Sequence, residues 1–239
     1  MSANVPFEMV QFLSRARRLA AMSLAGFAMT ACNPQEEASD RFKASGELVA
    51  LSGGDAGAGG ACHVCHGMKG EGDGNLAPRL AGLDQGYLLR QLDYFANGQR
   101  QHPQMSWIAR RLQNDDRLRV ADYYASMDAP KTAESPDTPS CSPAARDLYQ
   151  KGAPRRGLAA CANCHGKDGE GYGPGNPALA GQPSAYIVEQ LRQWRSGERY
   201  GDPLGVMRRA ALALSQQEIR ELGAYVAEVD NSRFQAKCP

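Results

Sequence analysis

Two copies of one short pattern, Cys-x-x-Cys-His, constrain this chain more than any other feature of its sequence. The copies begin at Cys62 and at Cys161. Two cysteines at this spacing can each form a thioether to one vinyl group of a single porphyrin, and the next histidine then lies beneath the iron as its proximal ligand. We therefore expect two covalently bound haem c groups. The predicted attachment cysteines and proximal ligands are Cys62, Cys65, His66, Cys161, Cys164 and His165.

A single pattern of this kind also occurs in zinc sites and in redox-active dithiols. A structural zinc site needs four Cys or His ligands, and the chain has only 4 histidines. Three of them, His63, His66 and His165, lie inside the motifs, and the fourth is His102. Haem attachment is therefore the favoured interpretation of both motifs. His63 does not occupy the ligand position, so we expect it at the surface.

The two motifs lie at corresponding positions of an internal repeat. Residues 62–100 align without a gap with residues 161–199, including the glycine-rich stretch after each motif and a later Leu-Ala-Gly. A tandem repeat of this quality makes chance motif matches implausible and predicts two domains of similar fold.

Helical periodicity recurs in both halves. Apolar residues within residues 87–95 follow one helix face, and residues 186–194 repeat the pattern. Gly98 and Gly197 are expected to end these helices. No alternating segment is long enough for a sheet, so the sequence predicts an all-α fold.

The ligand opposite the histidine decides what each iron can do. A methionine thioether closes the coordination, raises the reduction potential and favours outer-sphere electron transfer. Met207 is the only methionine of the second half, and Met105 aligns with it, which makes them the expected sixth ligands. In the first half His102 remains a rival ligand that would lower the potential. We expect both methionines in a loop, ahead of a last helix that begins in the second half with a capping box of Ser215 and Glu218.

The N-terminal segment has the character of an export signal. Three arginines within residues 15–18 precede an apolar run from Leu19 to Ala31 that is too short to span a bilayer. The run leads into Met29-Thr30-Ala31-Cys32, which resembles a bacterial lipoprotein signal. We expect residues 1–32 to be this signal, with Cys32 lipidated as a membrane anchor. An ordinary secretory cleavage near Ala31 is the alternative.

Polar and proline-rich stretches separate the remaining parts. Residues 33–44 are predicted to be a flexible tether and residues 130–142 a linker. The two domains then span residues 45–129 and 143–239. Two further cysteines, Cys141 and Cys238, flank the second half and could form a disulfide in an oxidising compartment. Sequence alone leaves this pairing open.

Charge excludes one class of function. The formal net charge is +1, from 27 Lys and Arg against 26 Asp and Glu, and nothing in the sequence indicates a polybasic surface for nucleic acid. No later apolar run is long enough to span a membrane, and membrane attachment would therefore depend on lipid at Cys32.

Both halves share an ordered series of motifs: Cys-x-x-Cys-His-Gly, a glycine-rich loop, Pro-x-Leu-Ala-Gly, Tyr-x-x-x-Gln-Leu, Gly-x-Arg and a later Met. This series resembles the cytochrome c4 family of bacterial dihaem cytochromes, and is similar to the cytochrome subunit of flavocytochrome c sulfide dehydrogenase. The resemblance covers about residues 45–129 and 143–231. It implies a tandem repeat of two class I cytochrome c domains, related by a pseudo-twofold axis, with haem propionates facing the interface.

The resemblance also implies roles for residues around the haems. The backbone carbonyls of Pro78 and Pro177 would accept a hydrogen bond from the proximal histidines. Arg100 and Arg199 would pair with haem propionates, although solvated arginines are an equally good interpretation of sequence alone. Residues expected to line the interface between the domains are Tyr87, Gln91, Tyr186 and Gln190.

These features predict a periplasmic electron carrier rather than an enzyme. It would move single electrons from a respiratory donor, such as a cytochrome bc1-type complex or a dehydrogenase, to a terminal oxidase or other acceptor. The alternative is a haem subunit of a sulfide, thiosulfate or alcohol dehydrogenase complex. An intrinsic thiosulfate-oxidising or peroxidase activity would need an open or Cys-ligated iron, and the two matched methionines argue against it.

Overall fold

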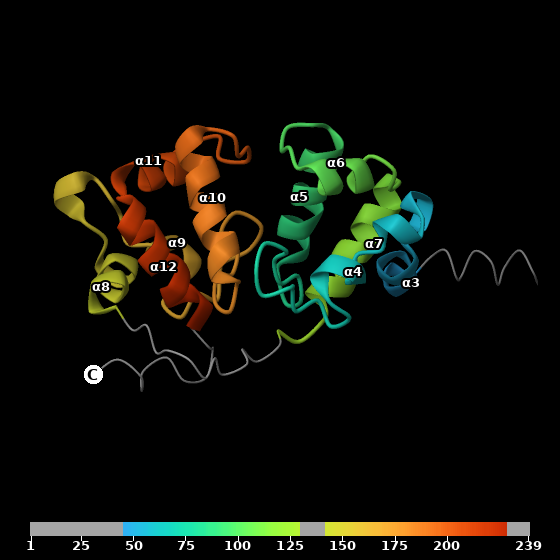
Figure 1. Cartoon of the computed structure of the whole chain (residues 1–239), viewed down its shortest axis with the longest axis horizontal. Helices are drawn as coiled ribbons and strands as arrows, with labels where there is room; N and C mark the ends of the chain where they lie inside the picture. The colour runs from blue at the N-terminus through green and yellow to red at the C-terminus, as the bar shows by residue number, and fades with distance from the viewer. Residues whose placement is uncertain (1–44, 130–141, 229–239) are drawn as a thin grey trace, which may run out of the picture. The chain divides into compact units, whose positions relative to one another are not determined.

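Residues 45–129 and 142–228 are described by the structure, a computed structural model, and all structural statements concern these residues (Figure 1). They lie within one unit of the chain, Arg41–Pro239. The predicted signal with Cys32, the tether, and the cysteines Cys141 and Cys238 fall outside the described residues. Within them, no helix has both the length and the apolar character needed to cross a bilayer.

The first half consists of helices joined by glycine-containing turns. In chain order these are α3 (Gly46–Ser52), the 3₁₀-helices η1 (Gly54–Ala56) and η2 (Ala58–Gly60), α4 (His63–His66), α5 (Gln85–Ala96), α6 (Pro103–Ala109) and α7 (Asn114–Ala125). Helices α3 and α5 both pack on α7, and α6 packs on α5.

The second half repeats this order. Its elements are α8 (Pro143–Lys151), the 3₁₀-helix η3 (Pro154–Arg156), α9 (Ala162–His165), α10 (Ser184–Ser196), α11 (Val206–Ala213) and α12 (Gln216–Glu228). Helices α8 and α10 pack on α12, and α11 packs on α10, as Figure 1 shows. The described residues form isolated β-bridges but no strand, so the prediction of an all-α fold is confirmed.

Each half has its own apolar core. In the second half Ile219 of α12 is fully buried at the centre of that core. The first half has Arg117 at the corresponding position of α7. Its guanidinium pairs with Asp93 of α5 at 2.9 Å and donates to the carbonyl of Leu112 at 2.6 Å. An ion pair between α7 and α5 in the first half thus stands where the second half has apolar packing of α12.

The opening helix of each half was not predicted. Helix α3 begins after Ser45, whose hydroxyl accepts a hydrogen bond from the N–H of Leu48 at 3.0 Å. Helix α8 begins after Ser142, whose hydroxyl accepts from the N–H of Ala145 at 3.3 Å, and Pro143 occupies its first turn. A serine cap, followed in α8 by a proline, is a start signal that the sequence contains.

Glycine ends the long helices, as predicted for one half and with an offset in the other. Helix α10 stops at Gly197, which has a left-handed φ of 84°. Helix α5 is capped by Asn97, one residue before the predicted Gly98. Gly98 follows with a φ of 79°.

The prediction that the methionines lie in a loop is wrong. Met105 lies in the first turn of α6 and Met207 in the first turn of α11. Side chains start both helices: the His102 ring accepts from the N–H of Met105 at 3.3 Å. In the second half the Asp202 carboxylate accepts from the N–H groups of Val206 and Arg208 at 2.8 and 3.0 Å.

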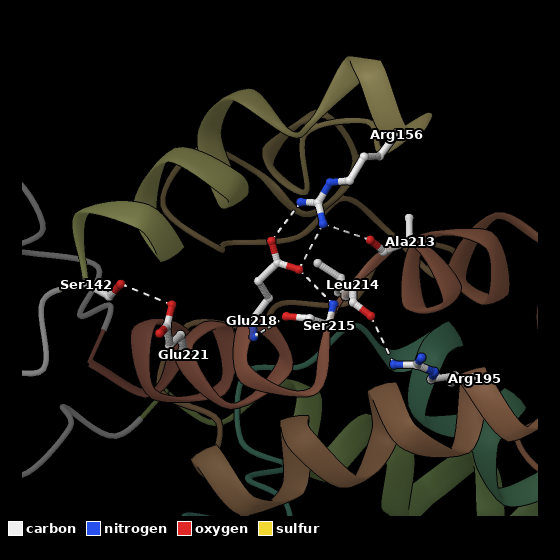
Figure 2. A network of polar contacts seen from close by, with 8 residues as sticks. All are labelled: Ser142, Arg156, Arg195, Ala213, Leu214, Ser215, Glu218 and Glu221. Atoms are coloured by element: carbon white, nitrogen blue, oxygen red, sulfur yellow. Dashed lines mark hydrogen bonds and ion pairs between the residues drawn. The ribbon is translucent and has the colours of Figure 1, made fainter.

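The capping box of the last helix is confirmed (Figure 2). The N–H of Ser215 donates to the Glu218 carboxylate at 2.7 Å, and the N–H of Glu218 donates to the Ser215 hydroxyl at 3.1 Å. Arg156 of η3 adds two hydrogen bonds to the same carboxylate, at 2.7 and 3.0 Å. The hydrogen bond from Arg156 is the main reason why the pKa of Glu218 falls to about 2. This network ties η3 to the start of α12.

Candidate haem sites

Each Cys-x-x-Cys-His motif forms a short helix that ends in its histidine. His66 ends α4 and His165 ends α9, and both are buried, at 7% exposed. The Nδ1 atom of His66 lies 2.9 Å from the carbonyl oxygen of Pro78, and that of His165 lies 2.8 Å from the carbonyl oxygen of Pro177. These are the contacts that the family resemblance implied. With Nδ1 donating to a carbonyl, Nε2 is the atom that can bind a metal.

Electrostatics keep both imidazoles in the form that ligates metals. Burial lowers the pKa of His66 and of His165, and the carbonyl contacts only partly oppose it. The histidines are therefore neutral near pH 7, as an iron ligand must be.

The glycine-rich stretch explains how the proline carbonyl reaches the histidine. The N–H of Gly72 donates to the carbonyl of His66 at 2.8 Å, and the N–H of Leu80 donates to the carbonyl of Gly70 at 2.8 Å. Gly72 has a φ of 85°, and a Cβ there would lie 2.7 Å from the carbonyl of Ala77. Only glycine fits at this point, and the loop it permits brings Pro78 back over α4.

The first cysteine of each motif is half-buried and the second is exposed. Burial raises the pKa of Cys62 and of Cys161 to about 11. A redox-active dithiol depends on a lowered thiol pKa, so these surroundings argue against that alternative. Among the described residues, no group of three or more Cys, His, Asp or Glu is placed to hold a metal ion.

Both candidate methionine ligands are half-buried on helices that pack on the long helix of their half. His102, the rival in the first half, is exposed, and its Nδ1 caps the helix that carries Met105. The arrangement therefore favours Met105 as the ligand and His102 as the residue that positions its turn. His63 is half-buried rather than at the surface as expected, because its Nδ1 faces the carbonyl of Ala50 at 3.4 Å.

Arg100 and Arg199 lie in a polar network that joins the two halves. Arg100 donates to the side-chain oxygens of Gln91 and Gln190, both at 2.7 Å. Arg199 donates to the same Gln190 oxygen at 2.7 Å and to the Tyr87 hydroxyl at 3.0 Å. Tyr87, Gln91 and Gln190, which were expected at the interface, take part in these contacts, and Arg100, at 6% exposed, is not a solvated arginine. Tyr186 lies at the edge of the network, 3.5 Å from Arg100.

This network contains two cations and no counter-charge among the described residues. None of the ion pairs formed there includes Arg100 or Arg199. The Nε atom of Arg199 is buried and finds no hydrogen-bond partner there. Buried charges in proteins are paired, so the network suits an anion. The propionate carboxylates of haem c are anions of this kind, and these residues therefore fit the predicted cofactor.

A second contact between the halves was missed by the sequence analysis. It joins Arg79 and Gln182, which are 4% and 3% exposed. The Gln182 side chain accepts from the backbone N–H of Arg79 at 3.1 Å and donates to the carbonyl of Arg79 at 3.0 Å. The repeat contained a signal for this contact. Arg79 corresponds to Ala178 and Gln182 to Leu83, so at each of these two positions one half has a polar residue and the other an apolar one.

Comparisons with known proteins agree with this arrangement. A family profile described as Cytochrome c matches residues 146–230. The chain is 36% identical over 207 residues to a protein of Stutzerimonas stutzeri (strain A1501) named thiosulfate dehydrogenase electron acceptor, covering 86% of this chain and 94% of that one. It is also 36% identical over 178 residues to the cytochrome c4 of Thiocapsa roseopersicina, covering 72% of this chain and 89% of that one.

Two solved structures share the fold. The reduced recombinant cytochrome c4 from Pseudomonas stutzeri matches with a TM-score of 0.66 and 30% identity, over 70% of this chain and 93% of that one. The thiosulfate dehydrogenase from Marichromatium purpuratum matches with a TM-score of 0.68 and 41% identity over 79% of this chain. This chain spans only 41% of the length of that protein.

Proposed function

Because the chain belongs to the cytochrome c4 family of dihaem c-type cytochromes, we propose that each half holds one haem c in its own Cys-x-x-Cys-His motif. The protein is an electron carrier with covalently bound haem c, and not itself an enzyme. The observation that supports the two sites best is the matched contact of each motif histidine with a proline carbonyl, at 2.9 Å in the first half and 2.8 Å in the second.

The residues of each site have distinct tasks. Haem c supplies one-electron chemistry between ferric and ferrous iron. The cysteines would anchor it, the histidine and methionine would bind its iron, and the proline carbonyl would orient the imidazole and increase its basicity. We assign the first site to Cys62, Cys65, His66, Pro78 and Met105, and the second to Cys161, Cys164, His165, Pro177 and Met207.

Arg100 and Arg199 are proposed to neutralise the propionates. Their guanidinium groups converge on Gln190 from the two halves, and no carboxylate of the described residues pairs with them. Two cations at this position would favour the electron-rich ferrous state of a haem held in either half. That arrangement suits transfer of an electron from one half to the other.

We propose a thiosulfate-oxidising dehydrogenase as the electron donor, and a terminal oxidase or other respiratory protein as the acceptor. The names of the relative from Stutzerimonas stutzeri and of the structure from Marichromatium purpuratum support this donor. A cytochrome bc1-type complex or another dehydrogenase is the competing donor.

We also propose that the protein works in the periplasm, held to a membrane by lipid on Cys32. Support comes from the apolar run that leads into Met29-Thr30-Ala31-Cys32. A Cys32→Ser variant should then appear in the soluble periplasmic fraction, whereas wild-type protein stays with membranes until detergent is added. Equal distribution of the two proteins would contradict the anchor.

Rapid mixing tests the electron-transfer role. Oxidised holoprotein is mixed with thiosulfate alone, with thiosulfate and a purified thiosulfate dehydrogenase, or with quinol and a bc1-type complex, while haem absorbance is followed. Reduction of both haems only in the second mixture supports the proposal. Reduction by thiosulfate alone would identify an enzyme, and reduction only in the third mixture would replace the proposed donor.

A further inference from the structure

We propose that Arg79 and Gln182 form a clasp through which the second half sets the reduction potential of the first-half haem alone. The term clasp denotes these two residues and the hydrogen bonds between them. The inference rests on the proposed function, because it takes His66 to be an axial ligand.

The clasp acts on the peptide group that orients His66. The carbonyl of Pro78 and the N–H of Arg79 belong to the same planar peptide unit. His66 donates to that carbonyl at 2.9 Å, and the N–H on the opposite edge donates to Gln182 at 3.1 Å. The three groups form a chain of hydrogen bonds, and such chains polarise one another. Gln182 therefore makes the Pro78 carbonyl a better acceptor for the imidazole N–H.

The remaining contacts hold this peptide unit in place. The Gln182 amide donates to the next carbonyl, that of Arg79, at 3.0 Å. The Arg79 guanidinium donates to the carbonyl of Ala180 in the second half at 2.9 Å and to the carbonyl of Ala81 in its own half. Both side chains are almost fully buried, so water does not compete for these bonds. The peptide unit has little freedom to turn away from His66.

The second half has no equivalent device. Ala178 follows Pro177 and has no guanidinium, and the residue that corresponds to Gln182 is Leu83, which has no amide. Leu83 instead is buried in the core of the first half. His165 therefore bonds to a carbonyl that no clasp of this kind supports.

The sign of the effect follows from the chemistry of the ligand. A stronger hydrogen bond from Nδ1 makes the imidazole more electron-donating, which stabilises ferric iron and lowers the potential. The clasp is thus expected to keep the first-half potential lower than its Cys, His and Met ligands alone would set it. Loss of Gln182 should raise that potential and leave the second one unchanged.

Gln182→Leu is the decisive variant, because it installs the residue that the repeat itself uses at Leu83. It removes both bonds to the Arg79 backbone and keeps the Arg79 charge, so no change in local charge confuses the result. The two midpoint potentials of the full-length holoprotein are measured by spectroelectrochemical titration, and each is assigned from the paramagnetic NMR signals of its ligands. We expect one potential, that of the first half, to move upward.

Tyr94→Ala is the matched control. It removes a different contact between the halves, the edge-to-face packing of Tyr94 on Tyr200 at 5.0 Å, without touching the Pro78 loop. Gln182→Met, which preserves side-chain length, serves as a second variant if Gln182→Leu does not fold.

A rise confined to the first-half haem in the Gln182 variants, absent in Tyr94→Ala, supports the clasp. Unchanged potentials in folded Gln182 variants, or an equal shift in Tyr94→Ala, overturn it. The proposed ligation is judged separately, from the wild-type far-red band of methionine-bound ferric haem and the wild-type ligand signals. If these do not report His66 and Met105 as ligands, the proposed site fails and not merely the clasp.

Discussion

Met105 and Met207 occupy equivalent turns, but the residues that hold those turns differ chemically. A neutral imidazole, that of His102, caps α6, and partial burial and Arg100 lower its pKa. A carboxylate, that of Asp202, caps α11 through two backbone N–H groups. The two methionines are thus placed by interactions of unequal strength, since charge-assisted hydrogen bonds are the stronger kind.

Replacing one methionine should open one iron and leave the other closed. For Met207→Ala we expect half of the far-red band of the ferric protein to disappear, and carbon monoxide to bind one haem after reduction, because a coordination position is left free. Optical titration measures both. Met68→Ala is the control, since Met68 is 60% exposed and should not affect either signal. An intact far-red band in Met207→Ala would remove Met207 from the site.

Among the elements, α12 has the best-defined start, and its stability should depend on pH. The pKa of Glu218 is lowered to about 2, mainly by the hydrogen bond from Arg156. A lowered pKa in the folded state adds stability above the ordinary carboxyl pKa, and that contribution is lost as the pH falls toward the folded value. We expect Glu218→Gln to melt below wild type at pH 7, with the difference shrinking between about pH 4.5 and pH 2.

Thermal unfolding followed by circular dichroism measures this difference. Asp116→Asn is the matched control, because Asp116 holds the corresponding place on α7 and pairs only weakly, with Arg119 at 3.5 Å on its own helix. It should change the melting temperature little at any pH. A Glu218→Gln deficit that persists unchanged at pH 2 would contradict the assigned cause.

Some of these elements could be predicted from the sequence, and others could not. Motif spacing and the repeat predicted the ligand candidates, and helical periodicity predicted α5, α10 and α12, because these signals are local. Helices α3 and α8 were missed although Ser45 and Ser142 cap them. The Arg79–Gln182 contact joins residues far apart in the chain, and only the packing of one half on the other creates it. The family resemblance supplied the proline carbonyls, which spacing alone could not have identified.

At the scale of the whole molecule, the two arginines should tune the haems separately. Arg100→Gln and Arg199→Gln each remove a buried cation, which disfavours the ferrous state. We expect the potential of the haem in the same half to fall by an amount equivalent to about 1 kcal/mol. Spectroelectrochemical titration measures the shift. Arg155→Gln, an exposed cation in solvent, should move neither potential, and a comparable shift there would show that the effect is not local.

The clasp also affects which halves can pair with each other. Two copies of the first half, paired face to face, would oppose Arg79 to Leu83 and leave the buried peptide N–H of Arg79 without an amide oxygen to receive it. Two copies of the second half would oppose Gln182 to Ala178, which offers the same backbone groups but has no guanidinium to reach a carbonyl of the other copy as Arg79 does. Self-pairing is therefore penalised for the first half, which favours its pairing with the second half over pairing with a copy of itself.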